Sequence, residues 1–373
     1  LNNALKMNKA AGIYFHHIAD EVVKKFSKNF ACVSYEAGKL EQILLFVLKH
    51  WGENLPSALM ARLEKFEESF GLEVATLSEG KAKFTLILGS DFYAHENANL
   101  LAALAGVIAR ATPFRVMLIP PRTNSLGVAK ICTLSREKKP GKTLGYNEMG
   151  EFKFSIFEGD LDAGALNQQE GTFTSINNEV VPTNAALAHK GYFLNDIANA
   201  LGLAAKNTID YTAQLPKEKG YRGVKFDDLE NFYANDGTSH RGYKLEISNF
   251  APKEDIEPLF KEQNELNLKE DEALISLANP INLPSFFANY ASQTAKRAVL
   301  YASGEFMAKF EISQNEAVIL EKNGQKLAIC VELDSELGGV AAYLGDYDDK
   351  LDVSAIFEGK SFASVKIIKA ENE

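Results

Sequence analysis

The chain has 373 residues, of which 46% are hydrophobic and 24% are charged, and its formal net charge is −10. A chain of this length is expected to form more than one core, because single cores stop growing near about 250–300 residues. The acidic balance argues against binding to nucleic acid or to anionic lipid, since no basic cluster outweighs the surrounding carboxylates.

The chain begins with a predicted helix, strand and further helix. Ile18, Val22, Val23 and Phe26 recur at helical spacing, and residues 30–35 form an apolar run that is typical of a strand.

A longer helix is predicted around residue 60. Leu59, Leu63, Phe66 and Phe70 share one helical face, and Gly71 follows them as an expected stop signal.

Residues 84–88 and 114–119 are expected to be fully buried strands, with a helix over 97–110 between them. Together they predict a βαβ unit, whose crossover covers a parallel sheet. This part of the chain is therefore expected to be a layered, Rossmann-like α/β fold with a parallel sheet.

The C-terminal part changes to a β pattern. Residues 317–322 and 325–333 are β-rich, and the dipeptide at 323–324 between them is Asn-Gly, which favours a type I′ hairpin. Further β-rich runs at 340–344 and 364–369 are punctuated by glycines. We expect a small β-barrel-like domain here.

Three regions follow from these patterns: an α/β region over 1–210, an irregular connecting segment over 211–268, and a β-rich domain over 269–373.

The turn after the strand at 84–88 is the first candidate site. Gly89 and Asp91 lie where α/β proteins bind ligands, at the carboxyl end of a strand. The turn lacks a G-x-G-x-x-G pattern, however, and the second strand runs into Pro120-Pro121-Arg122 without the acidic residue that would hold a ribose. A tight turn packed on the sheet is the favoured interpretation.

The adjacent histidines His16 and His17 are a second candidate. Neighbouring side chains on a strand or helix point to different faces, and no nearby cysteine or second histidine pair completes a ligand set. We therefore expect no metal site, and no sequence motif indicates a catalytic residue.

The cysteines bear on redox chemistry. Cys32, Cys132 and Cys330 are widely separated and form no C-x-x-C unit. This sparse usage is typical of a reducing cytoplasm. A Cys₄ iron–sulfur cluster needs four thiolates, so this chain is not expected to hold one.

One segment carries a family resemblance. Residues 166–174 read LNQQEGTFT, and residues 180–186 read VVPTNAA. This stretch resembles the E-G-T-F-x-N segment of the molybdopterin oxidoreductase superfamily, with Ser175 in place of its asparagine. It is most similar to the branch that forms the large peripheral subunit of bacterial respiratory complex I. The other matching segments are 12–18, 87–95, 112–127 and 192–203.

The resemblance implies layered α/β domains, a C-terminal β-barrel-like domain and a degenerate cofactor pocket. The residues of that pocket would be Gly89, Asp91, Glu170, Gly171 and Thr172. In family members that bind the cofactor, a proline usually stands beside the glycine and an acidic residue follows the second strand. This chain has Phe92 and Pro120-Pro121 instead, and Glu179-Val180-Val181 in place of the family's Arg-Val-Gln removes a cation that could have met phosphate. No cofactor is expected in this fragment.

The chain starts at Leu1 without an initiator methionine, from which we expect a longer parent polypeptide. The resemblance implies that iron–sulfur clusters lie in an N-terminal part of the parent subunit that is missing here.

We therefore expect a scaffold portion of the large peripheral subunit of the NADH-quinone oxidoreductase, which couples electron transfer to quinone to proton pumping in the respiratory chain. The implied partners are other hydrophilic-arm subunits, at the cytoplasmic face of the inner membrane without direct membrane insertion. One alternative is a fragment of a molybdenum- or tungsten-dependent oxidoreductase such as a formate dehydrogenase. Another is an unrelated binding module that uses the helical region.

Overall fold

The structure is a computed structural model of the chain. It describes residues 2–8, 10–18, 30–35, 38–68, 70, 83–120, 122–133, 141–147, 150–156, 159–202, 215–246, 256–261, 268–277, 298–345 and 353–370. The chain divides into two compact units, which are called unit 1 (Leu1–Met117 and Pro252–Glu373) and unit 2 (Leu118–Ala251).

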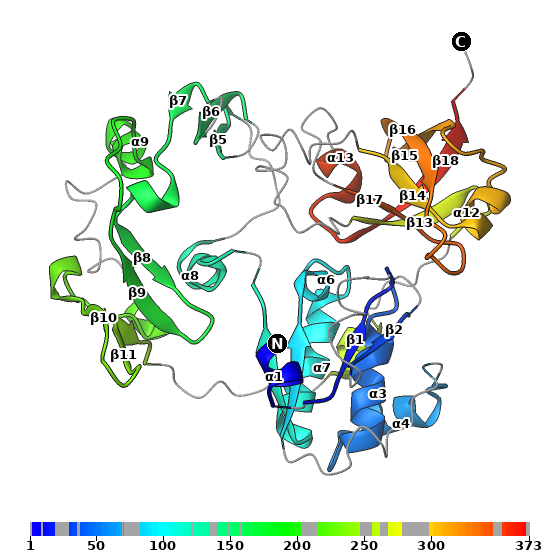
Figure 1. The fold of residues 1–373 in the computed structure, drawn as a ribbon, viewed down its shortest axis with the longest axis horizontal. Coiled ribbons are helices and arrows are strands. Elements are labelled where there is room, and N and C mark those ends of the chain that lie inside the picture. The colour runs from blue at the N-terminus through cyan, green and yellow to red at the C-terminus, as the bar shows by residue number, and fades with distance from the viewer. Residues whose placement is uncertain are drawn as a thin grey trace. The chain divides into compact units, whose positions relative to one another are not determined.

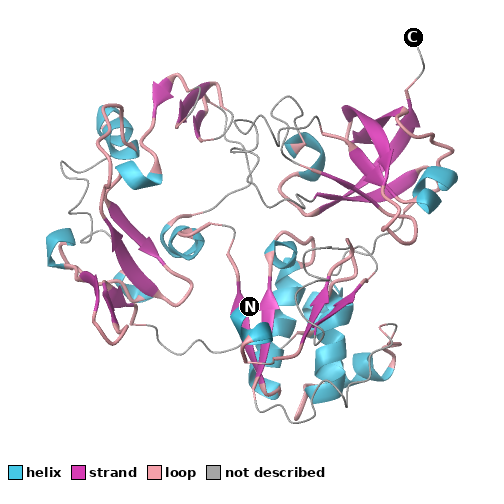
Figure 2. Ribbon diagram, in the orientation of Figure 1, coloured by secondary structure: helices cyan, strands magenta, loops and turns pink. Residues whose placement is uncertain are grey.

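The first part of unit 1 mixes helices with two small sheets (Figures 1 and 2). Its strands are β1 (Gly12–Phe15), β2 (Phe30–Val33), β3 (Phe84–Leu88) and β4 (Phe114–Leu118). Its helices are α1 (Asn2–Lys6), α3 (Glu41–Trp51), α4 (Ser57–Glu64), α6 (Ser90–Tyr93) and α7 (Ala98–Ala111). Strand β1 pairs in parallel with β2, and β3 pairs with β4.

Helix α7 confirms the helix predicted between two strands. Leu100, Leu104 and Ile108 recur every fourth residue and are at most 2% exposed. This face is buried, and α7 packs against α3. The strands that precede and follow α7 are neighbours in one sheet, as the β-α-β pattern predicted.

The prediction that these two strands are fully buried is wrong. Ile87 in β3 and Met117 in β4 are 45% and 51% exposed, and Ile119 just after β4 is 53% exposed. Side chains alternate between the faces of a strand, so these apolar residues belong to the exposed face. An apolar run in the sequence did not distinguish a strand with one exposed face from a strand that is buried on both faces.

Helix α4 ends earlier than the sequence predicted. It stops at Glu64, so that Phe66 and Phe70 lie beyond it rather than on its face. The ring of Phe70 instead packs edge-on against Phe15 and Phe46, with centroids 5.3 and 5.5 Å apart. These tertiary contacts outweigh the local helical pattern. The helix predicted from Ile18 to Phe26 falls largely outside the described residues.

The second part of unit 1 is a closed six-stranded barrel, which confirms the barrel expected in the C-terminal region. Its strands are β13 (Glu272–Leu277), β14 (Leu300–Ala302), β15 (Ala317–Lys322), β16 (Gln325–Leu333), β17 (Ala342–Leu344) and β18 (Phe362–Lys369). They close in the order β13-β17-β14-β16-β15-β18. The pairs β13–β17 and β14–β16 are parallel, and the other pairs are antiparallel.

All six strands contribute buried side chains to the barrel core. Helices α12 (Gly304–Lys309) and α13 (Ser354–Phe357) add Phe306 and Phe357, which are at most 1% exposed. Helix α10 (Glu257–Lys261) lies before the barrel in the chain and packs against α7.

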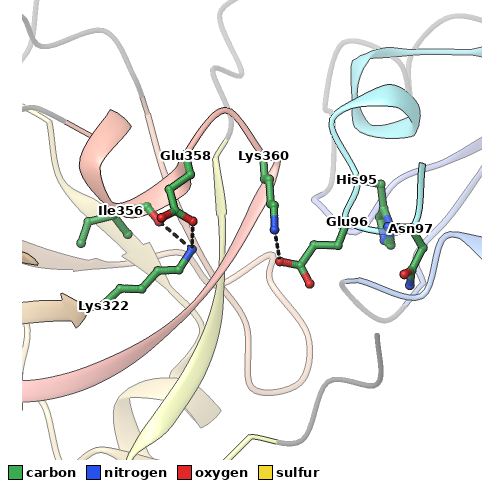
Figure 3. A network of polar contacts seen from close by, with 7 residues as sticks. All are labelled: His95, Glu96, Asn97, Lys322, Ile356, Glu358 and Lys360. Carbon is green, nitrogen blue, oxygen red and sulfur yellow. Dashed lines mark hydrogen bonds and ion pairs between the residues drawn. The ribbon is translucent and has the colours of Figure 1, made fainter. Parts of the chain in front are cut away.

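The barrel touches the α/β part of unit 1 through the loop that precedes β18. Ser361 N donates to Ala94 O at 3.0 Å, and Lys360 Nζ lies 2.6 Å from Glu96 Oε1 (Figure 3). The ring of Phe362 packs against His95, with centroids 6.1 Å apart. The loop between α6 and α7 is thus fixed against the barrel by polar and aromatic contacts.

Unit 2 consists of small sheets and short helices. Strands β5 (Leu144–Tyr146), β6 (Phe152–Ser155) and β7 (Leu161–Asp162) form a parallel sheet, and β8 (Gly171–Thr174), β9 (Glu179–Thr183) and β12 (Tyr243–Lys244) form an antiparallel one. Strands β10 (Asn231–Tyr233) and β11 (Ser239–Arg241) form a hairpin. The helical elements are α8 (Ser125–Ile131), α9 (Leu194–Ala200), η1 (Leu166–Gln168), η3 (Lys217–Lys219) and η4 (Phe226–Asp228).

The hairpin β15–β16 has the bounds that the sequence predicted, and it gives a direct test of the barrel. Asn323 and Gly324 have φ values of 51° and 77°, as a type I′ turn requires. Replacing Gly324 with Ala should destabilise the barrel by about 1–2 kcal/mol, because an L side chain is strained at positive φ. Chemical denaturation measures this change.

Gly338→Ala is the matched control, since Gly338 has no positive φ and open space around it. Its effect should stay within about 0.5 kcal/mol. Equal effects of the two substitutions would contradict the turn assignment.

Candidate functional site

The two adjacent histidines leave the end of β1 side by side. The strand ends at Phe15, so His16 and His17 lie outside its alternating pattern. Their rings stack, with centroids 4.5 Å apart and planes inclined by 24°. The expectation that they point to different faces is therefore wrong, because that rule holds only within a regular strand or helix.

Asp91 is brought to this histidine pair from helix α6, just after β3. Its Oδ2 lies 3.3 Å from Nε2 of His16, and the two side chains are 26% and 23% exposed. The carboxylate is thus within ion-pair range of an imidazole that solvent can still reach.

The second ring nitrogen of His16 contacts its own turn. Nδ1 lies 2.9 Å from the carbonyl oxygen of Ile18 and 3.0 Å from the amide nitrogen of Ile18. It can accept from the amide or, when it carries the proton, donate to the carbonyl. Nδ1 has a partner in either tautomer of His16, but only the unprotonated Nδ1 accepts from the Ile18 amide.

His17 has no such partner. Both of its ring nitrogens are shielded from solvent and make no hydrogen bond in the described part of the chain. Tyr35 and Phe362 pack against its ring, with centroids 5.9 and 5.0 Å away. Burial, together with neighbouring His16, lowers the pKa of His17 to about 3. The imidazole is neutral at physiological pH, with its lone pair and its N–H both unused.

Asp91 is held in its charged form by its neighbours. Burial alone would raise the pKa of Asp91, but the hydrogen bond and charge of His16, with a hydrogen bond from Ser361, hold it below the ordinary value. Ser361 belongs to the loop before β18, so the barrel contributes directly to this carboxylate.

His16, His17 and Asp91 each offer one ligating atom, and these three atoms lie within 4.8 Å of one another. Two imidazole nitrogens and one carboxylate oxygen are a common donor set for zinc and for related transition metals. The site can therefore bind a cation; nothing in this donor set by itself supplies a nucleophile.

No family model and no curated protein matches this sequence. Among the described residues, no helix has the length and apolar character needed to cross a membrane.

The other candidate residues fall in different places. Gly89 lies at the N-terminus of α6, two residues before Asp91, and its φ of −96° is open to any residue. In unit 2, Glu170 is exposed and precedes β8, while Gly171 and Thr172 pair with β9 within the antiparallel sheet. Gly89 therefore lies near Asp91 in unit 1, whereas Glu170, Gly171 and Thr172 are consecutive residues at the start of β8 in unit 2.

Unit 2 shows how the Glu-Gly-Thr segment is held. The side-chain oxygen of Asn124, at the N-terminus of α8, accepts from the amide of Thr174 at 2.8 Å. The hydroxyl of Thr174 lies 2.9 Å from the hydroxyl of Tyr221. Strand β8 is thus tied to α8 on one side and to the small core around Tyr221 on the other.

Sequence reasoning named Asp91 and His16 separately and did not connect them. Both follow the carboxyl ends of strands, and polar residues at such ends commonly converge. Their positions just after two predicted strands were the sequence feature from which their meeting could have been predicted.

The unpaired ring of His17 predicts an unusual effect on stability. Replacing His17 with Phe keeps an aromatic ring against Tyr35 and Phe362 and removes two buried polar atoms without partners. In metal-free buffer the variant should be more stable by about 1–3 kcal/mol, the usual cost of an unsatisfied buried group. Urea denaturation of both proteins in chelator measures the difference, and a loss of stability would show that the imidazole makes a favourable contact.

Proposed function

We propose that this chain is a structural portion of the large peripheral subunit of bacterial respiratory complex I and carries no redox cofactor of its own. It would contribute stability and contact surface to the hydrophilic arm at the cytoplasmic face of the inner membrane. Electrons would pass to quinone through iron–sulfur clusters in another part of the parent subunit.

The observation that carries this proposal is that the segments resembling the family contact each other in pairs. In unit 1, segment 12–18 meets segment 87–95 where His16 faces Asp91 at 3.3 Å. In unit 2, segment 112–127 meets segment 166–174 where Asn124 accepts from Thr174 at 2.8 Å. Contacts between two segments restrict which residues each of them can have, which is a physical reason for both segments to keep the residues typical of a family.

Two further features support the proposal. The closed barrel in the C-terminal region agrees with the β-barrel-like domain that the resemblance implies. The chain has three cysteines in all, fewer than the four that a Cys₄ cluster needs.

Affinity purification of the tagged chain from its own cells tests the assignment. The hydrophilic-arm subunits of complex I should copurify with it in fixed proportion. Recovery of other oxidoreductase subunits, or of no respiratory subunit, would contradict the proposal.

Metal analysis of the purified chain separates the scaffold from the alternative enzyme. For the scaffold we expect neither the visible absorbance of an iron–sulfur cluster nor molybdenum or tungsten in stoichiometric amount. About one atom of molybdenum or tungsten per chain would instead favour a molybdopterin-dependent oxidoreductase such as a formate dehydrogenase.

A further inference from the structure

We propose that His16, His17 and Asp91 form a binding site for one Zn²⁺ ion in unit 1. The inference rests on the geometry of these three side chains and does not depend on the chain's place in complex I. It replaces the expectation, drawn from the sequence, that the histidine pair lacks a third ligand.

The separation of the ligand atoms fits a tetrahedral ion. Zinc–nitrogen and zinc–oxygen bonds of about 2.0–2.2 Å at a tetrahedral angle place two ligands about 3.3–3.6 Å apart. The observed distance between His16 Nε2 and Asp91 Oδ2 is 3.3 Å, and all three ligand atoms lie within 4.8 Å. A small side-chain rotation therefore brings the third atom to bonding distance, and a water molecule can complete the fourth position.

His17 supplies the strongest reason for a ligand. Its ring nitrogens are shielded and without a hydrogen-bond partner among the described residues, which is costly for a buried polar group. Coordination by one of these nitrogens would satisfy the atom that the protein leaves unpaired.

The surroundings of the other two ligands match those of metal sites. When Nε2 of His16 binds the ion, the proton moves to Nδ1, which then donates to the Ile18 carbonyl at 2.9 Å and no longer accepts from the Ile18 amide. The hydroxyl of Ser361 lies close enough to Asp91 to help lower the pKa of that carboxyl. Such outer contacts orient the ligating side chains in known metal sites.

Zinc is redox-inert, so a bound ion is compatible with an electron-silent scaffold. It would fix the turn after β1 to helix α6 at the point where Phe362 packs on His17 and the amide of Ser361 donates to the carbonyl of Ala94 at the end of α6.

Calorimetric titration of the metal-free full chain with Zn²⁺ tests the proposal. We expect one ion per chain, and Co²⁺ bound in its place should show the intense visible absorption of four-coordinate cobalt. Mg²⁺ and Ca²⁺ should not compete, because they prefer all-oxygen sites. Absence of stoichiometric Zn²⁺ binding, or equal competition by Mg²⁺, would overturn the proposal.

Variants show whether binding occurs at this site. His17→Phe and Asp91→Asn should each weaken Zn²⁺ binding at least about 100-fold. Loss of a residue that only supports a ligand already costs up to about 100-fold in affinity, and these variants change the ligands themselves. The matched control is His50→Gln: His50 lies 2.7 Å from Glu68, and this pair has no third ligand among the described residues. The control should bind as the parent does. Unchanged binding in both site variants, with circular dichroism showing that they are folded, would overturn the proposal, as would an equal loss in the control.

Discussion

The carboxylate of Asp91 lies where three pieces of unit 1 meet: the turn after β1, helix α6 and the loop before β18. His16 approaches it at 3.3 Å, and the hydroxyl of Ser361 helps to lower its pKa. A partly buried carboxylate needs such partners, because removing a charge from water is costly. The position of α6, and of the loop that leads from it into α7, therefore depends on the partners that the β1 turn and the barrel supply.

Turn residues and hydrophobic spacing correctly predicted the hairpin β15–β16 and helix α7, whose conformation is determined by neighbouring residues in the chain. The Asn323-Gly324 turn fixes the register of β15 and β16, since both residues have the positive φ that the turn needs. Helix α7 was predicted because its apolar residues, which form its buried face, recur at helical spacing. In both places, the neighbours along the chain carry the relevant information.

The failures arose where contacts between distant residues decide the structure. Phe66 and Phe70 continue the helical spacing of α4, yet Phe70 packs on Phe15 and Phe46 and the helix has already ended. The meeting of His16 with Asp91 likewise depends on how two separate strands are placed, which no spacing along the chain encodes. The histidine pair and Asp91 were predicted only as separate candidates for the same reason.

The physical basis of the proposed zinc site is the organisation of polar groups at the contact between the α/β part and the barrel of unit 1, and it is independent of the proposed scaffold role. X-ray absorption spectroscopy at the zinc edge of the Zn²⁺-loaded chain tests this basis most directly. The account predicts a first shell of nitrogen and oxygen at about 2.0–2.1 Å with the scattering pattern of two imidazoles. Sulfur at about 2.3 Å, or a shell without imidazole, would place the ion elsewhere and contradict the account.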